Sequence, residues 1–145
     1  MWIQVQEMLL AEEKETDEEI NEELEAFNPL IPGSGNELIF TLMFEIDSKS
    51  ARDRILRTLC DVEEHVYLKC GSHSVRSVPI AGEENVSRID NHGKTSAVHF
   101  RKFVLDDPSI LQSPASVSIE HPNYEHAATI NAAMLEELKK DLRHD

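Results

Sequence analysis

Apolar side chains that recur at every second position are the feature that most constrains this fold. Residues 38–46 alternate between a wholly apolar set and a mixed set, which predicts a central β-strand. Residues 65–80 predict two strands joined near Gly71, and further strands are expected at 96–105 and 117–121. Helical and strand patterns come in groups rather than in strict alternation. The sequence therefore predicts an α+β fold with a mostly antiparallel sheet of about five strands.

Three helical segments are expected around this sheet. Residues 1–30 carry ten acidic residues and one basic residue, with apolar residues at helical spacing, so we expect two short helices or one bent helix. A middle helix should begin after Ser48 or Ser50, because either serine can cap it. A C-terminal helix is expected over about 131–143. We predict a single domain over residues 1–145, with an acidic helical segment at 1–30 and an α+β core at 37–145.

The charge and cysteine content exclude several classes of protein. The chain has 28 acidic and 14 basic residues, a formal charge of −14, which argues against nucleic acid or an anionic membrane face as a partner. No apolar run approaches the roughly 20 residues that span a bilayer. Cys60 and Cys70 are the two cysteines, and neither lies in a CxxC pair. They could meet as a redox pair, but we favour two inert thiols and a cytoplasmic location.

His121 is the most informative candidate for a functional site. Alternation places it on the same side of its strand as Val117 and Ile119, which should be the buried side. Pro122 should end the strand there, with Tyr124 close behind. The histidine could bond a carbonyl or a tyrosine hydroxyl and pin the strand end, it could contact a ligand or metal, or it could be exposed.

His99 lies mid-strand on a half-polar face, which suits either a solvated sheet or a polar pocket. If its strand neighbours that of His121, the two imidazoles could approach each other, and Glu45 or Glu7 could complete the set. Imidazole and carboxylate together bind Fe, Mn or Zn, so His99, His121 and Glu45 are candidate metal ligands. The alternative is a polar network that locks the sheet to a helix.

Several segments, taken in order, resemble those of a bacterial domain-of-unknown-function family, number 3501. The matching segments cover nearly the whole chain: Gln6-Glu7-Met8, Glu22-Glu23-Leu24, residues 27–32, 41–45 and 95–100, and His121-Pro122 with Tyr124. Genes of that family are often found beside rubrerythrin and an iron–sulfur oxidoreductase, which implies a role around peroxide defence or iron redox chemistry. The candidate pocket residues that this chain shares with the family pattern are Glu7, Glu45, His99, His121 and Tyr124.

Three functions are compatible with these observations. The first is an accessory or binding protein without turnover of its own, serving an oxidative-stress or iron redox system such as rubrerythrin and its iron–sulfur oxidoreductase. The second is a small metal-dependent redox or hydrolytic enzyme with a His/carboxylate site. The third is an interaction protein whose acidic helical segment docks onto a basic partner, in which case binding should weaken at high salt.

Overall fold

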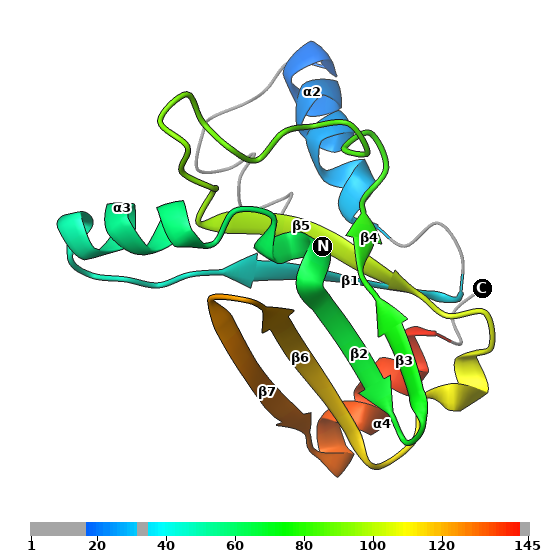
Figure 1. Ribbon diagram of the computed structural model, residues 1–145. Helices are drawn as coiled ribbons and strands as arrows, with labels where there is room; N and C mark the ends of the chain where they lie inside the picture. Colours follow the sequence, from blue (N-terminus) through cyan, green and yellow to red (C-terminus); the bar gives the residue numbers. More distant parts are fainter. Residues whose placement is uncertain (1–16, 32–34, 143–145) are drawn as a thin grey trace.

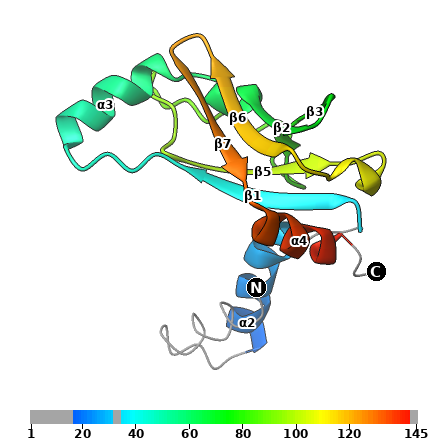
Figure 2. The same ribbon diagram turned by 90° about the horizontal axis from the view of Figure 1, so that it is seen from below.

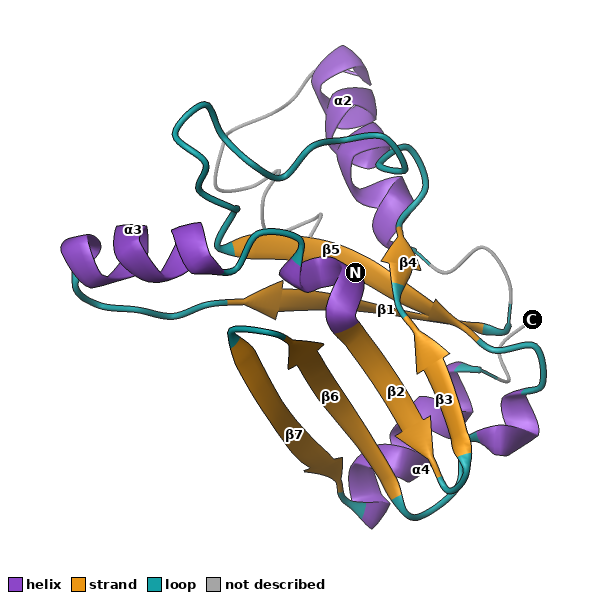
Figure 3. Cartoon of the chain, viewed as in Figure 1, coloured by secondary structure: helices purple, strands orange, loops and turns teal. Residues whose placement is uncertain are grey.

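A computed structural model describes residues 17–31 and 35–142 of the chain. Glu7 and the first half of the predicted acidic helical segment lie outside these residues. Within them, seven strands form two antiparallel sheets (Figures 1 and 3). The α+β class is confirmed, whereas the expected sheet of about five strands is wrong.

The smaller sheet has three strands in the order β1-β5-β4, and the larger has four in the order β3-β2-β6-β7. Their bounds are β1 Glu37–Met43, β2 Val66–Cys70, β3 His73–Arg76, β4 Val78–Pro79, β5 Val98–Val104, β6 Ala115–His121 and β7 Tyr124–Ile130. β1 is not central as predicted, because in the described part of the chain it pairs only with β5. The chain passes from the larger sheet to the smaller between β3 and β4, at Ser77.

The sequence analysis missed β7 because Pro122 ends β6 without ending the sheet. His121 pairs with Tyr124, so Pro122 and Asn123 form a two-residue hairpin turn. β7 itself carries little apolar alternation, and every residue from Tyr124 to Thr129 is exposed. A half-buried strand shows alternating apolar and polar residues in the sequence, whereas an edge strand exposed on both faces shows no such pattern.

The three α-helices are α2 Asp17–Phe27, α3 Lys49–Thr58 and α4 Ala132–Asp141, and three short 3₁₀ turns are η1 Asn28–Leu30, η2 Val62–His65 and η3 Pro108–Ile110. α3 begins after Ser48, whose side chain accepts a hydrogen bond from the Ala51 N–H, as one of the two predicted caps. Asn131 caps α4 in the same way. α2 confirms a helix in the second half of the acidic segment. No described helix is long and apolar enough to cross a membrane.

One apolar cluster joins both sheets to α4. On β2, Val66, Leu68 and Cys70 point inward, and cross-strand pairing places Val117 and Ile119 of β6 on the same face. Leu135 of α4 and Leu142, the residue after this helix, cover this face, and α2 lies beyond the smaller sheet (Figures 1 and 2). Phe40 and Phe103 stack at 4.6 Å between ring centroids where β1 and β5 meet the core. Each fully buried aliphatic side chain of this kind stabilises the fold by about 1.5–3 kcal/mol.

Candidate functional site

The half-polar face of β5 points into the protein rather than into solvent. His99, Arg101 and Phe103 alternate along the strand, and all three are buried, with His99 1% and Arg101 4% exposed. β5 lies between β1, which pairs with it along its whole length, and β4, which pairs with Arg101 and Lys102. A histidine and an arginine placed there must find polar partners from other elements.

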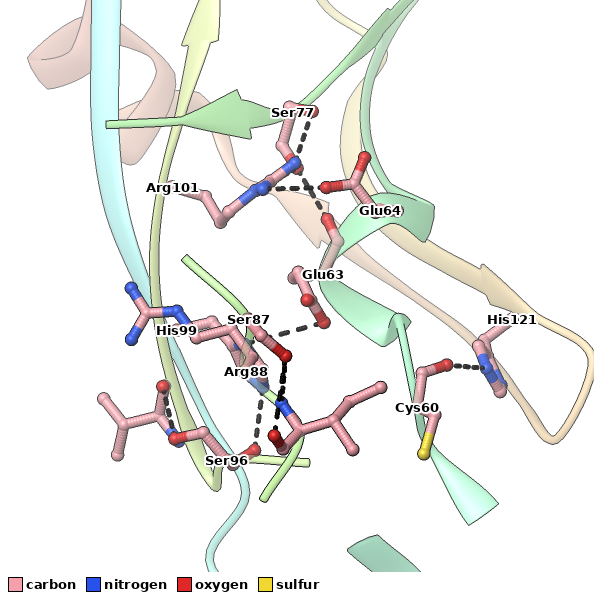
Figure 4. Close-up of polar contacts among 12 residues, drawn as sticks. Cys60, Glu63, Glu64, Ser77, Ser87, Arg88, Ser96, His99, Arg101 and His121 are labelled. Carbon is pink, nitrogen blue, oxygen red and sulfur yellow. Dashed lines mark hydrogen bonds and ion pairs between the residues drawn. The ribbon is translucent and has the colours of Figure 1, made fainter. Parts of the chain in front are cut away.

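Each of the three guanidinium nitrogens of Arg101 has a hydrogen-bond partner. Its Nη1 donates to Glu64 Oε1 at 3.1 Å, its Nη2 to the Ser77 carbonyl at 2.9 Å and its Nε to Ser77 Oγ at 3.3 Å (Figure 4). Arg76 donates to the other oxygen of Glu64 at 2.5 Å. Because Ser77 lies where the chain changes sheets, this network fixes the joint between the two sheets.

His99 has a partner for only one of its ring nitrogens. Nε2 lies 2.8 Å from the Ser96 carbonyl oxygen, which can only accept, so Nε2 carries the proton in the neutral ring. Burial lowers the pKa of His99, and the attraction of the Glu63 carboxylate opposes this shift without reversing it, which favours the neutral ring. Nδ1 then presents a lone pair toward Glu63 Oε2, 3.6 Å away.

Glu63 is held against His99 by the turn η2. Asp61 adopts a left-handed conformation, with φ of 63°, immediately before this turn. The Glu63 carbonyl accepts a hydrogen bond from Ser77 Oγ at 3.0 Å, and the residue is 8% exposed. Neither Glu63 Oε2 nor His99 Nδ1 has a hydrogen-bond donor within the described residues. Two buried acceptors therefore face each other.

A small polar cleft of about 50 Å³ opens beside this pair. Its charged and imidazole side chains are those of Glu63, Glu64, Glu83, Glu84, Arg88, His99 and Arg101. The loop predicted at 81–94 supplies Glu83 and Arg88, which form an ion pair with each other. One water needs roughly 10–15 Å³ measured in this way, so the cleft suits an ion with waters or a molecule of a few atoms.

His121 is buried, as its strand position predicted, but both of its nitrogens are satisfied. Nε2 lies 2.9 Å from the Cys60 carbonyl oxygen, and Nδ1 accepts from the Asn123 N–H at 3.1 Å. Its ring also meets His65 edge-on at 5.1 Å between centroids. In this arrangement His121 fastens the end of β6 to Cys60, two residues beyond α3, which is one of the roles the sequence left open. Figure 4 shows this contact apart from the cluster around His99.

The structure does not bring the predicted pocket residues together in one site, although Tyr124 pairs with His121 across the hairpin. Tyr124 is 41% exposed and packs edge-on against Phe44, whose ring lies in turn against His99. Glu45 is exposed, and Glu7 lies outside the described residues. Within residues 17–31 and 35–142, no group of three or more His, Cys, Asp or Glu side chains could hold a metal ion. The described geometry therefore gives no support to a site shared by His99, His121 and Glu45.

The two cysteines are free thiols in the structure. Cys60 is partly buried, with Sγ 3.4 Å from the Gly93 carbonyl oxygen, and Cys70 is buried in the apolar core. Burial raises the pKa of the Cys70 thiol, which disfavours the reactive thiolate.

Sequence reasoning missed Glu63, Glu64, Ser77 and Arg88 as partners of the His99 face. The available signal was Arg101, which lies two residues before the core residue Phe103 in the same strand and therefore shares its buried face. A buried guanidinium requires carboxylate or carbonyl partners, but the pattern along β5 does not say which turn supplies them.

Comparisons with known proteins identify the family of this chain. A crystal structure of a "novel protein of unknown function" from Burkholderia pseudomallei K96243 is similar to this chain, with 33% sequence identity and a TM-score of 0.78. The similarity covers 95% of this chain and 72% of that one. The curated proteins contain no match. Residues 1–142 match the family described as "Protein of unknown function (DUF3501)", and the chain therefore belongs to the DUF3501 family.

Proposed function

We propose that this protein is an accessory binding protein that takes a small polar ligand in the cleft beside His99 and Glu63. The observation that carries this proposal is the facing pair of acceptors, His99 Nδ1 and Glu63 Oε2, neither of which has a donor in the described structure. Leaving a buried polar atom unpaired costs about 1–3 kcal/mol. A ligand that supplies positive charge or a hydrogen-bond donor between the two atoms recovers that energy.

Binding fits this site better than turnover. The other nitrogen of His99 is committed to the Ser96 carbonyl, and the cleft is too small to enclose a sizeable substrate. A metal-dependent enzyme using His99 and His121 together is the alternative. It would require His121 to give up its contacts with Cys60 and Asn123. The family resemblance adds the expectation that the protein serves a rubrerythrin-linked iron redox system.

A thermal-shift measurement tests the binding function. Unfolding of the purified full chain would be followed in a panel of small polar solutes, including ammonium, guanidinium, formate and divalent cations. A ligand present at 100 times its Kd stabilises by about 2.7 kcal/mol, which raises Tm by several degrees. We expect at least one solute to do so for the wild type but not for Glu63→Gln.

The matched control is Glu125→Gln, which changes the same group on the exposed strand β7. It should respond to the solutes as the wild type does. If no solute shifts the wild type, or if Glu63→Gln responds equally, the cleft is not a binding site.

Docking of a basic partner onto α2 is a second candidate, and it has its own observation. Glu18, Glu22 and Glu25 are all exposed, and their spacing places them along one side of the helix, while Ile20 and Leu24 are partly buried. Co-purification that is lost at high salt, and lost when these three glutamates become glutamine, would support docking. Equal recovery of partners by the wild type and by the triple variant would contradict it.

A further inference from the structure

We propose that His99 Nδ1 and Glu63 Oε2 are the two protein ligands of a divalent cation that accepts tetrahedral coordination, of which Zn²⁺ is the type. This inference rests on the proposed function, because it names the ligand of the same cleft. Neither Glu63 nor the pairing of Glu63 with His99 was apparent in the sequence.

The first support is the kind of atom that each residue offers. Nε2 of His99 donates to the Ser96 carbonyl, so the neutral ring can only accept at Nδ1. An ionised carboxylate can likewise only accept. A neutral imidazole nitrogen and a carboxylate oxygen are both standard ligands for Zn²⁺ and related metals. Metal-binding histidines are commonly oriented by a hydrogen bond from their other ring nitrogen to a backbone carbonyl, as His99 Nε2 is by Ser96.

The second support is the distance between the two atoms. Metal–nitrogen and metal–oxygen bonds of about 2.1 Å across a gap of 3.6 Å subtend an angle of about 118° at the metal. That angle is close to the tetrahedral value, whereas an octahedral right angle would bring the atoms to about 3.0 Å. A shared proton would draw them closer still, into the 2.7–3.2 Å range of an N–H···O hydrogen bond. The observed gap fits a metal better than a proton.

The third support is the charge around the cleft. Four carboxylates, of Glu63, Glu64, Glu83 and Glu84, line it against the two guanidiniums of Arg88 and Arg101. Arg101 and Arg88 are engaged with Glu64 and Glu83 respectively, and Arg76 also pairs with Glu64. Even with Arg76 counted, the negative charge remains in excess. A cation entering beside Glu63 would reduce this excess rather than add to it.

Two protein ligands leave coordination positions open, and the cleft provides their space. About 50 Å³ beside the pair can hold more than one water, so waters can complete the coordination shell. A site of this kind exchanges its ion more readily than a closed structural site with four protein ligands.

Calorimetric titration of ZnCl₂ into the full chain, purified without an affinity tag and stripped with a chelator, tests the proposal. We expect one Zn²⁺ to bind per chain, with at least tenfold weaker binding in both Glu63→Gln and His99→Gln. Glu63→Gln replaces the carboxylate oxygen by an amide of the same shape, so it remains informative if His99→Gln does not fold. His126→Gln, on the exposed strand β7, should bind Zn²⁺ as the wild type does.

Two results would overturn the metal site. One is a wild type that binds no Zn²⁺, and the other is Zn²⁺ binding that survives unchanged in Glu63→Gln, which would assign it to surface histidines. If either occurs while a non-metal solute still stabilises the wild type and not Glu63→Gln, the binding function stands and the metal does not. If no solute binds at all, both proposals fail.

Discussion

The protein contains two buried histidines whose surroundings differ in one respect. His121 and His99 are both nearly inaccessible, and each ring places Nε2 against a backbone carbonyl. The Nδ1 of His121 receives the Asn123 N–H, while the Nδ1 of His99 receives nothing and faces a carboxylate. Both ring nitrogens of His121 are used in contacts that hold the fold together. The Nδ1 of His99 has no such contact in the described structure, and the proposed binding site depends on this atom.

The difference arises from where each histidine lies in its sheet. His121 ends β6, and the hairpin turn after it leaves the Asn123 N–H free to turn back toward the ring. His99 lies within β5, where it pairs with Leu42 of β1, while β4 pairs with Arg101 and Lys102 farther along the strand. A histidine within a central strand therefore depends on side chains or ligands from outside the sheet.

The largest effect that separates the two histidines should come from replacing each with alanine. His121→Ala removes a packed ring and leaves the Cys60 carbonyl and the Asn123 N–H without partners, so it should lower the free energy of unfolding by about 3 kcal/mol. His99→Ala leaves only the Ser96 carbonyl without a partner, and it removes an unfavourable contact with Glu63. Its loss of unfolding free energy should therefore be about 1 kcal/mol smaller than that of His121→Ala. Urea unfolding of both variants measures this difference, and equal losses would remove the distinction.

The next effect contrasts two adjacent glutamates. Glu64→Gln weakens charge-assisted bonds to Arg76 and Arg101 and should lower the free energy of unfolding of the metal-free protein by about 2 kcal/mol. Glu63→Gln should instead raise it by about 1 kcal/mol, because the new amide can donate to His99 Nδ1. Chemical denaturation in the presence of a chelator measures both values. A loss of stability in Glu63→Gln would mean that Nδ1 already has a donor.

These two contrasts also show which features of the fold and the candidate site can be predicted from the sequence. Alternation along 117–121 correctly predicted that His121 points inward, and Ser48 was one of the two serines predicted to cap α3. The helices and most strands were predictable because their signals lie within one element. β7 was missed because an exposed edge strand leaves no periodic apolar pattern.

The candidate site was less accessible because its partners come from distant segments. His99 was identified, but its partner Glu63 lies 36 residues earlier, in a 3₁₀ turn that no periodicity marks. Glu45, two residues beyond β1, was chosen as a carboxylate partner, but the alternation along 44–46 turns Phe44 toward His99 and leaves Glu45 exposed. Which carboxylate lies beside His99 of β5 depends on how the two sheets are joined. Arg101 and Ser77 hydrogen-bond to each other at that joint.

The smallest expected effect concerns a carboxylate whose surroundings are the reverse of those of Glu63. Asp90, in the loop that brings Arg88 to the cleft, accepts at Oδ1 from the N–H groups of Lys94 at 3.0 Å and His92 at 2.9 Å. The Lys94 N–H, followed by that of His92, holds the pKa of Asp90 below its ordinary value of 3.8. A carboxyl with a lowered pKa contributes stability above that ordinary value and loses it as the pH falls through the lowered one.

Asp90→Asn should therefore melt slightly below the wild type at about pH 6, and the gap should close as the pH approaches about 3. Asparagine keeps an oxygen acceptor at the same place, so only the charge-assisted part of the two bonds is lost. Tm measured across this range for both proteins checks the prediction, with the exposed Asp106→Asn as a control that should show no such convergence. A gap that stayed constant with pH would mean that the charge of Asp90 contributes nothing to its two hydrogen bonds.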